Sequence, residues 1–107
     1  MADSSGGAYR VACPLPVSAQ LKAWGASAVS RGEGAEYVEA LSFINHKLTI
    51  DPAGWGDPLY PLRKVGLMMR RGMRRPLQVH YAVDETLRLV FVKSFALLFD
   101  FGGEQGS

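Results

Sequence analysis

Six basic side chains with no acidic residue among them form the part of the sequence best suited to chemistry. They lie within residues 58–83 of a 107-residue chain whose net charge is only +2. Residues 1–57 carry four basic and six acidic side chains, and residues 84–107 carry two and four, so the positive charge is local. Arginine predominates in the block, and its planar guanidinium can hold two phosphate oxygens at once. We therefore expect an anion-binding surface formed by Arg63, Lys64, Arg70, Arg71, Arg74 and Arg75.

The partner of such a surface would be RNA, DNA or an acidic segment of another protein. The alternative is a charged hairpin that contacts only solvent and keeps the protein soluble. His80 is a candidate for a role at this surface, because it lies on the strand-like run that follows the basic block. Its imidazole can transfer a proton near neutral pH, although a histidine without a function on a half-exposed strand fits the same position.

Other chemistries lack the residues that they need. No HExxH motif or paired Cys/His spacing predicts a metal site, and no G-x-x-x-x-G-K-[ST] motif predicts a phosphate-binding loop. We therefore expect neither a metal nor a cofactor. Cys13 is the single cysteine, so no intrachain disulfide can form and a disulfide-dependent secreted fold is disfavoured.

The chain also lacks signals for export or membrane insertion. The N-terminal MADSSGG has no basic and apolar regions of the kind that form a signal peptide. The longest apolar run, Leu89–Phe101, is interrupted by Lys93 and Asp100 and is shorter than the ~20 residues that span a bilayer. We expect a cytoplasmic protein that does not bind a membrane. Its length suits one domain, placed at residues 8–101 between a disordered leader (1–7) and a flexible tail (102–107).

The first half of this domain is expected to contain a strand and two helices. Apolar residues alternate with others around Tyr9–Leu15, which is typical of a strand. Ser18 is expected to cap a first helix that ends at Arg31-Gly32, with the glycine in the left-handed conformation. A second helix is expected at about residues 35–49, because Asp51-Pro52 then disfavours further helix. The two helices would form a hairpin.

The second half is expected to form strands. Residues 52–61 hold three prolines and two glycines and predict a loop. Strand-like patterns follow at residues 67–69, 77–83 and 87–95, with a turn near Gly72, and the last is apolar on both faces like a central strand covered on both sides. The order predicts an α+β fold, in which an N-terminal strand and a helical hairpin precede an antiparallel sheet of three to four strands.

The end of the domain is unusually apolar. Large hydrophobic side chains crowd the last run of the domain, too many to leave exposed to water. They either complete the core or form an interface with a partner protein or a second copy of the chain. For a homodimer, the candidate contacts are Phe95, Leu97, Leu98 and Phe99.

Three short motifs, in this order, resemble a known family. They are L-x-x-D-P (Leu48 to Pro52), V-H-Y-A-V-D-E (Val79 to Glu85) and L-V-F-V-K-S-F (Leu89 to Phe95). With the basic hairpin between them, they are similar to the RelE/ParE superfamily of bacterial type II toxins, which includes HigB-like members. The resemblance covers roughly residues 8–95. It implies a compact fold of a helical hairpin and a sheet, bound and neutralised by a cognate antitoxin.

The resemblance implies two different activities. RelE-like members enter the ribosome and cut mRNA, in a reaction where the 2′-hydroxyl attacks the adjacent phosphate with help from basic side chains and often a Tyr or His. In this sequence Arg71, Arg74 and Arg75 would hold the phosphate, and His80 or Tyr81 would transfer the proton. We take His80, Tyr81 and Arg75 as candidate catalytic residues. ParE-like members instead poison DNA gyrase without cutting RNA.

The sequence departs from the RelE-like pattern at two places. The strand arginine of the family falls on the neutral Gln78, and the stretch Phe95–Asp100 carries no Arg, Lys or His where active members have a basic or aromatic cluster. A toxin that acts by binding, or another binding module for protein or nucleic acid, is therefore the alternative to a ribosome-dependent endonuclease. A third possibility is an α+β domain whose basic hairpin only keeps it soluble.

Overall fold

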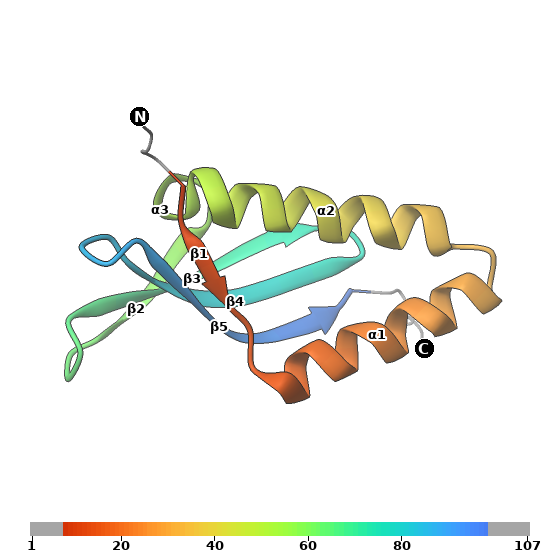
Figure 1. Ribbon diagram of the computed structural model, residues 1–107, viewed down its shortest axis with the longest axis horizontal. Coiled ribbons are helices and arrows are strands. Elements are labelled where there is room, and N and C mark those ends of the chain that lie inside the picture. The colour runs from red at the N-terminus through yellow and green to blue at the C-terminus, as the bar shows by residue number, and fades with distance from the viewer. Residues whose placement is uncertain (1–7, 99–107) are drawn as a thin grey trace.

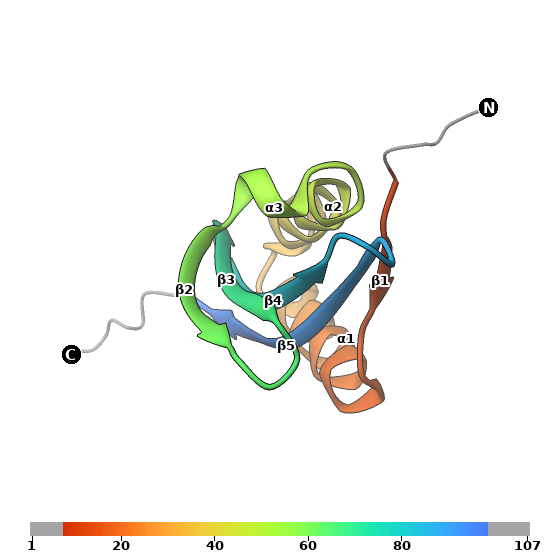
Figure 2. The same ribbon diagram turned by 90° about the vertical axis from the view of Figure 1, so that its left-hand side faces the viewer.

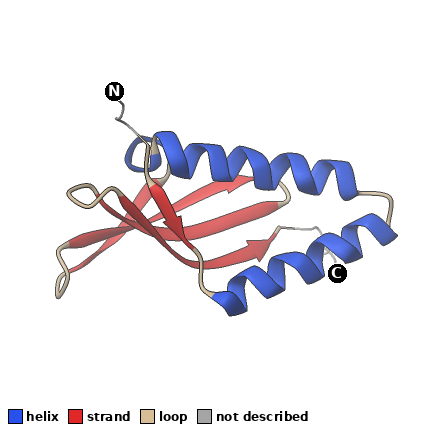
Figure 3. Ribbon diagram, in the orientation of Figure 1, coloured by secondary structure: helices blue, strands red, loops and turns tan. Residues whose placement is uncertain are grey.

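The computed structural model describes residues 8–98 and has an α+β fold. A five-stranded sheet in the order β1-β5-β4-β3-β2 packs with two long helices and one short helix (Figures 1 and 3). The strands are β1 (Arg10–Ala12), β2 (Asp57–Leu62), β3 (Leu67–Arg74), β4 (Leu77–Asp84) and β5 (Leu89–Leu97), and the helices are α1 (Leu15–Ser30), α2 (Gly34–Ile50) and α3 (Pro52–Trp55). The leader and tail predicted at residues 1–7 and 102–107 lie outside the described residues, as do residues 99–101.

The sheet is mixed and has five strands, whereas the sequence predicts an antiparallel sheet of three or four. β1 pairs in parallel with the start of β5, where Val11 lies opposite Val90, and the other neighbouring strands are antiparallel. Residues 13–88, including both long helices, connect β1 to β5. A connection of that length lets two strands run in the same direction.

The predicted helical hairpin is confirmed, although its first helix begins earlier than expected. α1 starts at Leu15, after Pro14 in an extended conformation, so Ser18 lies inside the helix rather than capping it. Pro16 lies in the first turn of α1, where the N–H that proline lacks would have no partner within the helix. Gly32 has φ +76°, as expected for the residue that ends the helix.

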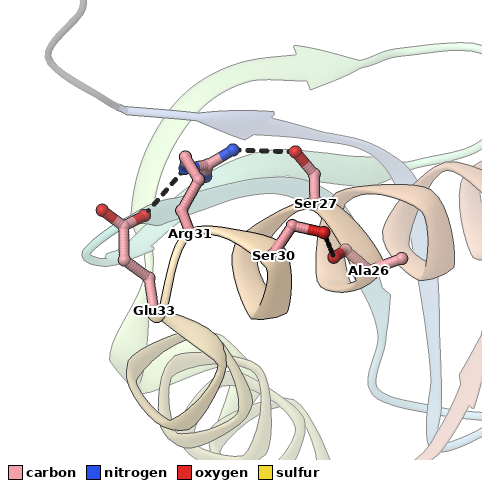
Figure 4. Close-up of polar contacts among 5 residues, drawn as sticks. All are labelled: Ala26, Ser27, Ser30, Arg31 and Glu33. Carbon is pink, nitrogen blue, oxygen red and sulfur yellow. Dashed lines mark hydrogen bonds and ion pairs between the residues drawn. The ribbon is translucent and has the colours of Figure 1, made fainter.

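Polar contacts join the two helices at their connection. Arg31 donates one hydrogen bond to the Ser27 hydroxyl at 2.7 Å and another to the Glu33 carboxylate at 3.1 Å (Figure 4). Ser30 donates to the carbonyl of Ala26 one turn back. The Arg31 side chain therefore links the last turn of α1 to the residue before α2. As predicted, α2 ends at Ile50, directly before Asp51-Pro52.

The prediction of a loop at residues 52–61 is wrong. This segment forms the one-turn helix α3 and the edge strand β2, which pairs with β3 through a bulge between Pro58 and Tyr60. Proline is tolerated here because an edge strand pairs with a neighbour on one side only and so needs fewer backbone donors. Pairing with β3 thus overrides the local signal for a turn.

β3 and β5 also differ from the sequence interpretation. β3 continues through Gly72 to Arg74, so the predicted turn near Gly72 is wrong, and the reversal occurs at Arg75-Pro76 instead. β5 lies between two strands, but Phe91 is 40% exposed, so this strand is covered on one face only. β4 is the strand in which residues of both faces are most completely buried.

The core lies between the helices and one face of the sheet. Its buried residues come from α2 and from alternate positions of β4 and β5, and they include Tyr37, Ile44, Leu48, Leu77, Val79, Tyr81, Val90, Val92 and Phe95. Lys93 is an extra residue at a bulge in β5, so Val92 and Phe95 can both face the core. α2 and α3 lie over one face of β3 and β4 (Figure 2). We call the opposite face, which no described helix covers, the open face.

Within residues 8–98, no helix has both the length and the apolar character that crossing a membrane requires.

Candidate functional site

The alternation of side chains along β3 divides the basic block between the two faces of the sheet. Arg70 lies opposite Tyr81 and Arg74 opposite Leu77, and both of these partners on β4 are buried under the helices. Arg71 lies opposite His80, on the open face. Successive side chains of a strand point to opposite faces, so Arg70 and Arg71 cannot act together although they are neighbours in sequence.

The remaining basic residues lie at opposite ends of the sheet. Arg63 and Lys64 occupy the turn between β2 and β3, and Arg75 follows the far end of β3. The eight residues of β3 separate these ends by about 23 Å at the usual rise per residue. The six predicted residues therefore form no single anion-binding surface.

Arg74 is engaged by α2. Its Nη2 lies 3.0 Å from Oε2 of Glu39, and its guanidinium lies 4.6 Å from the centre of the Phe43 ring. Lys47 approaches the same ring at 5.6 Å. A cavity of about 360 Å³ lies next to this contact. Its lining includes the basic Arg74 and Arg75 and the acidic Glu33, Glu36 and Glu39. Acidic side chains of the helical hairpin thus offset the positive charge at this end of the sheet.

Tyr81 is a core residue. Its hydroxyl donates a 2.6 Å hydrogen bond to the carbonyl of Pro52, and its ring stacks on Trp55 at 6.2 Å between centroids. Burial raises the pKa of Tyr81 to about 12, against the smaller opposing effects of a Gly56 backbone hydrogen bond and of Arg70. A buried phenol with a raised pKa and an occupied donor is poorly suited to transfer a proton to a substrate. The arrangement instead fixes α3 against β4.

Arg70 and Gly72 of β3 contact the same region of the molecule, at Trp55 of α3 and the following Gly56. Arg70 donates to the carbonyl of Gly56 at 3.1 Å. Gly72 lies directly beneath Trp55, where a Cβ atom would overlap the indole ring. Gly72, which was predicted to lie in a turn, therefore allows α3 to pack closely on β3.

Arg71 and His80 are the predicted phosphate-binding and proton-transfer residues that the fold brings together. They are paired across β3 and β4, between Asp57 of β2 and Ser94 of β5. Arg71 is exposed and His80 is half-buried. Gln78 lies on the same face two residues along β4, at the position of the family's arginine.

An apolar groove on the same open face was missed by the sequence interpretation. The strand registers place Tyr60, Met69, Ala82 and Phe91 in one row, next to the row of Arg71 and His80. Met69 and Ala82 are 5% and 3% exposed and form a floor, although no described helix lies over them. The groove measures about 460 Å³ and is lined by residues that include Leu62, Val65, Leu67, Phe91 and Lys93. It was missed because Tyr60 falls in the segment, residues 52–61, that was interpreted as a loop.

The apolar C-terminal residues have separate roles. Phe95 is a core residue, Leu97 packs against the core, and Leu98 lines the cavity beside Arg75. Phe99, the fourth residue of the predicted dimer contact, lies outside the described residues. Phe95 is only 9% exposed, so it offers little surface to a second copy of the chain.

No group of three or more His, Cys, Asp or Glu side chains gathers as a metal site in the part of the chain that the structure describes. Cys13 is exposed, and partial burial raises the pKa of its thiol.

Comparison with protein-family models, with curated proteins and with solved structures finds no match for this chain.

Proposed function

We propose that this chain is a toxin-like protein of a type II toxin-antitoxin module, and that it acts by binding its target rather than by cutting RNA. The three motifs that resemble the RelE/ParE superfamily support the toxin assignment. The order of elements supports it as well, because a strand, a helical hairpin and a run of antiparallel strands follow one another as that resemblance implies. A cognate antitoxin would neutralise the protein, and DNA gyrase is the target expected of a ParE-like member.

The basic residues are separated between the two faces of the sheet, and this observation favours binding over catalysis. Cleavage of RNA needs cationic donors around the reacting phosphate and a group beside them that transfers a proton. In this chain Tyr81 is buried, Arg74 is paired with Glu39, and the position of the family's strand arginine is the neutral Gln78. The groups that a RelE-like reaction would use are therefore dispersed or missing.

Growth and translation assays test the proposal together. Induced expression in a bacterial host should stop growth, and the His80→Ala and Tyr81→Phe variants should stop it equally when they fold. Purified protein added to a translation reaction should leave the mRNA intact. Cleavage of the mRNA would refute the binding mechanism. Absence of growth inhibition by folded protein would refute the toxin assignment.

A second candidate function is a ribosome-dependent mRNA endonuclease, and the neighbouring positions of Arg71 and His80 favour it. This version predicts mRNA cleavage that is lost in both Arg71→Ala and His80→Ala. Matched controls are Arg63→Ala and His46→Ala, which replace exposed side chains of the same types outside the row. Cleavage that persists in His80→Ala would exclude this version.

A further inference from the structure

The groove on the open face has the shape and lining of a site for apolar side chains. Its floor is formed by Met69 and Ala82, and its sides by Phe91 and by the β2–β3 hairpin, where Val65 is 63% exposed. With the exposed Tyr60 beside it, this is a continuous apolar patch on a sheet face that no described helix covers. Patches of this kind on small proteins commonly mark interaction sites.

Basic side chains predominate around the groove. Lys93 lines it, Arg63 and Lys64 lie in the turn between Leu62 and Val65, and Arg71 lies in the adjacent row. Among the described residues, Asp84 also lines the groove and Asp57 lies opposite Arg71 in the adjacent row, so the four cations outnumber these two carboxylates. The Asp84 carboxylate accepts a hydrogen bond from the backbone N–H of Leu87, so it serves the β4–β5 turn. An acidic partner would therefore meet complementary charge around an apolar centre.

We propose that the open face is a docking surface for an acidic protein segment that places apolar side chains in the groove beside Val65, Met69 and Phe91. This inference rests on the proposed function, because it names the surface and the kind of partner through which a binding toxin would act. An aliphatic floor favours side chains such as leucine over nucleobases, which are usually held by aromatic stacking and by polar contacts to their edges. The cationic rim disfavours a second copy of the chain, since two such faces would oppose like charges.

Selection from a library tests the docking surface without knowledge of the natural partner. The probe is a phage-displayed library of random 12-residue peptides, panned on the purified full chain. The selected peptides should combine large apolar residues with Asp or Glu. Their binding, measured by fluorescence anisotropy with synthetic labelled peptides, should weaken at least tenfold in both Val65→Ser and Lys93→Glu.

Matched variants on the helical side control for nonspecific effects. Val29→Ser and Lys22→Glu change an exposed valine and an exposed lysine of α1 and should leave peptide affinity unchanged. All four substitutions are at exposed positions, so thermal unfolding should show folded protein in each case. Equal weakening by the α1 variants, or selection of basic peptides, would overturn the proposal.

Two further outcomes would assign the face to another occupant and also overturn the proposal. One is binding of a single-stranded RNA oligonucleotide that is lost in Val65→Ser. The other is a dimer in gel filtration that dissociates in the same variant. Peptide binding is measured on purified protein, so its failure is distinct from a failure of growth inhibition, which tests the toxin assignment alone.

Discussion

At the scale of single residues, Tyr81 and His80 show how adjacent positions on a strand acquire different chemistry. The Tyr81 hydroxyl is bonded to the Pro52 carbonyl inside the core, whereas His80 faces away from the helices beside Arg71. The hydroxyl of Tyr81 therefore contributes to stability through α3, while the imidazole of His80 remains on the face where a partner can reach it.

The hydrogen bond of Tyr81 should be measurable as stability. Tyr81→Phe keeps the stacked ring but leaves the buried carbonyl of Pro52 without this donor, so we expect a loss of about 1–3 kcal/mol in the free energy of unfolding. Urea denaturation of the two proteins measures the difference. The exposed Tyr60→Phe change is the matched control and should have almost no effect. Equal stabilities of Tyr81→Phe and the parent chain would contradict the role given to the hydroxyl.

The raised pKa of Tyr81 adds an alkaline dependence with a definite sign. The pKa is about 12 in the folded chain against an ordinary value of 10.0. The neutral phenol therefore favours the folded state below about pH 10, and this contribution is lost as the pH rises from 10 towards 12. The stability of the parent chain should fall more steeply across this range than that of Tyr81→Phe. Parallel pH profiles of the two proteins would show that Tyr81 titrates normally.

At the scale of elements, β3 joins the sheet to α2 and α3 through side chains that the sequence presents as a single basic cluster. Arg74 reaches Glu39 and Phe43 of α2, Arg70 reaches the carbonyl of Gly56, and Gly72 admits Trp55. Two of the four arginines at positions 70–75, Arg70 and Arg74, therefore connect β3 to α2 and to the segment after α3. The prolines of the edge strand β2 have a related structural effect, because they discourage pairing with strands of other chains.

The two neighbouring arginines at the end of β3 should differ in their effect on stability. Arg74→Ala removes an exposed ion pair and a contact with the Phe43 ring, each worth up to about 1 kcal/mol, so we expect a loss of about 0.5–1.5 kcal/mol. Arg75→Ala should change the free energy of unfolding by less than about 0.5 kcal/mol. Thermal and urea unfolding of both variants provide the comparison. A larger loss for Arg75→Ala would contradict the assignment of Arg74 to the packing of α2.

At the scale of the whole molecule, the basic side chains lie at separate places in the fold and do not form one positively charged surface. The end near Arg74 and Arg75 is offset by glutamates of the helical hairpin, and the positive rim of the open face surrounds an apolar groove. This distribution suits a partner that offers both apolar and acidic side chains better than it suits a polynucleotide.

The salt dependence of RNA binding tests this distribution. Six phosphate contacts would give a slope of log affinity against log salt concentration of about −4 for single-stranded RNA. Arg71 with one further cation would give a slope of about −0.7 to −1.4, and all four cations of the open face (Arg63, Lys64, Arg71 and Lys93) would give about −2.8, so for a single-stranded oligonucleotide we expect a slope no steeper than about −2.8. Measurements at several potassium chloride concentrations determine the slope. A value near −4 would mean that the six basic residues act on one strand after all.

Much of the fold could be predicted from the sequence because its signals are local. The helical hairpin follows from the spacing of Tyr37, Ile44 and Leu48 and from the stop signals at Gly32 and Pro52. β4 follows from the alternation of apolar residues along Leu77–Val83. In each case residues a few positions apart already carry the information, because the period of a helix or strand is fixed by backbone geometry.

The site could not be predicted in the same way, because it depends on pairing between distant segments. The local signals of residues 52–61 indicate a turn, and only contact with β3 makes them a short helix and an edge strand that complete the groove. The register of β3 against β4 also decides that Arg71 joins His80 while Arg70 and Arg74 turn towards the helices. A shift of one residue would exchange these faces. The sequence alone determined which charges the chain carries and where they lie along it, and the tertiary structure decided which of them can act together.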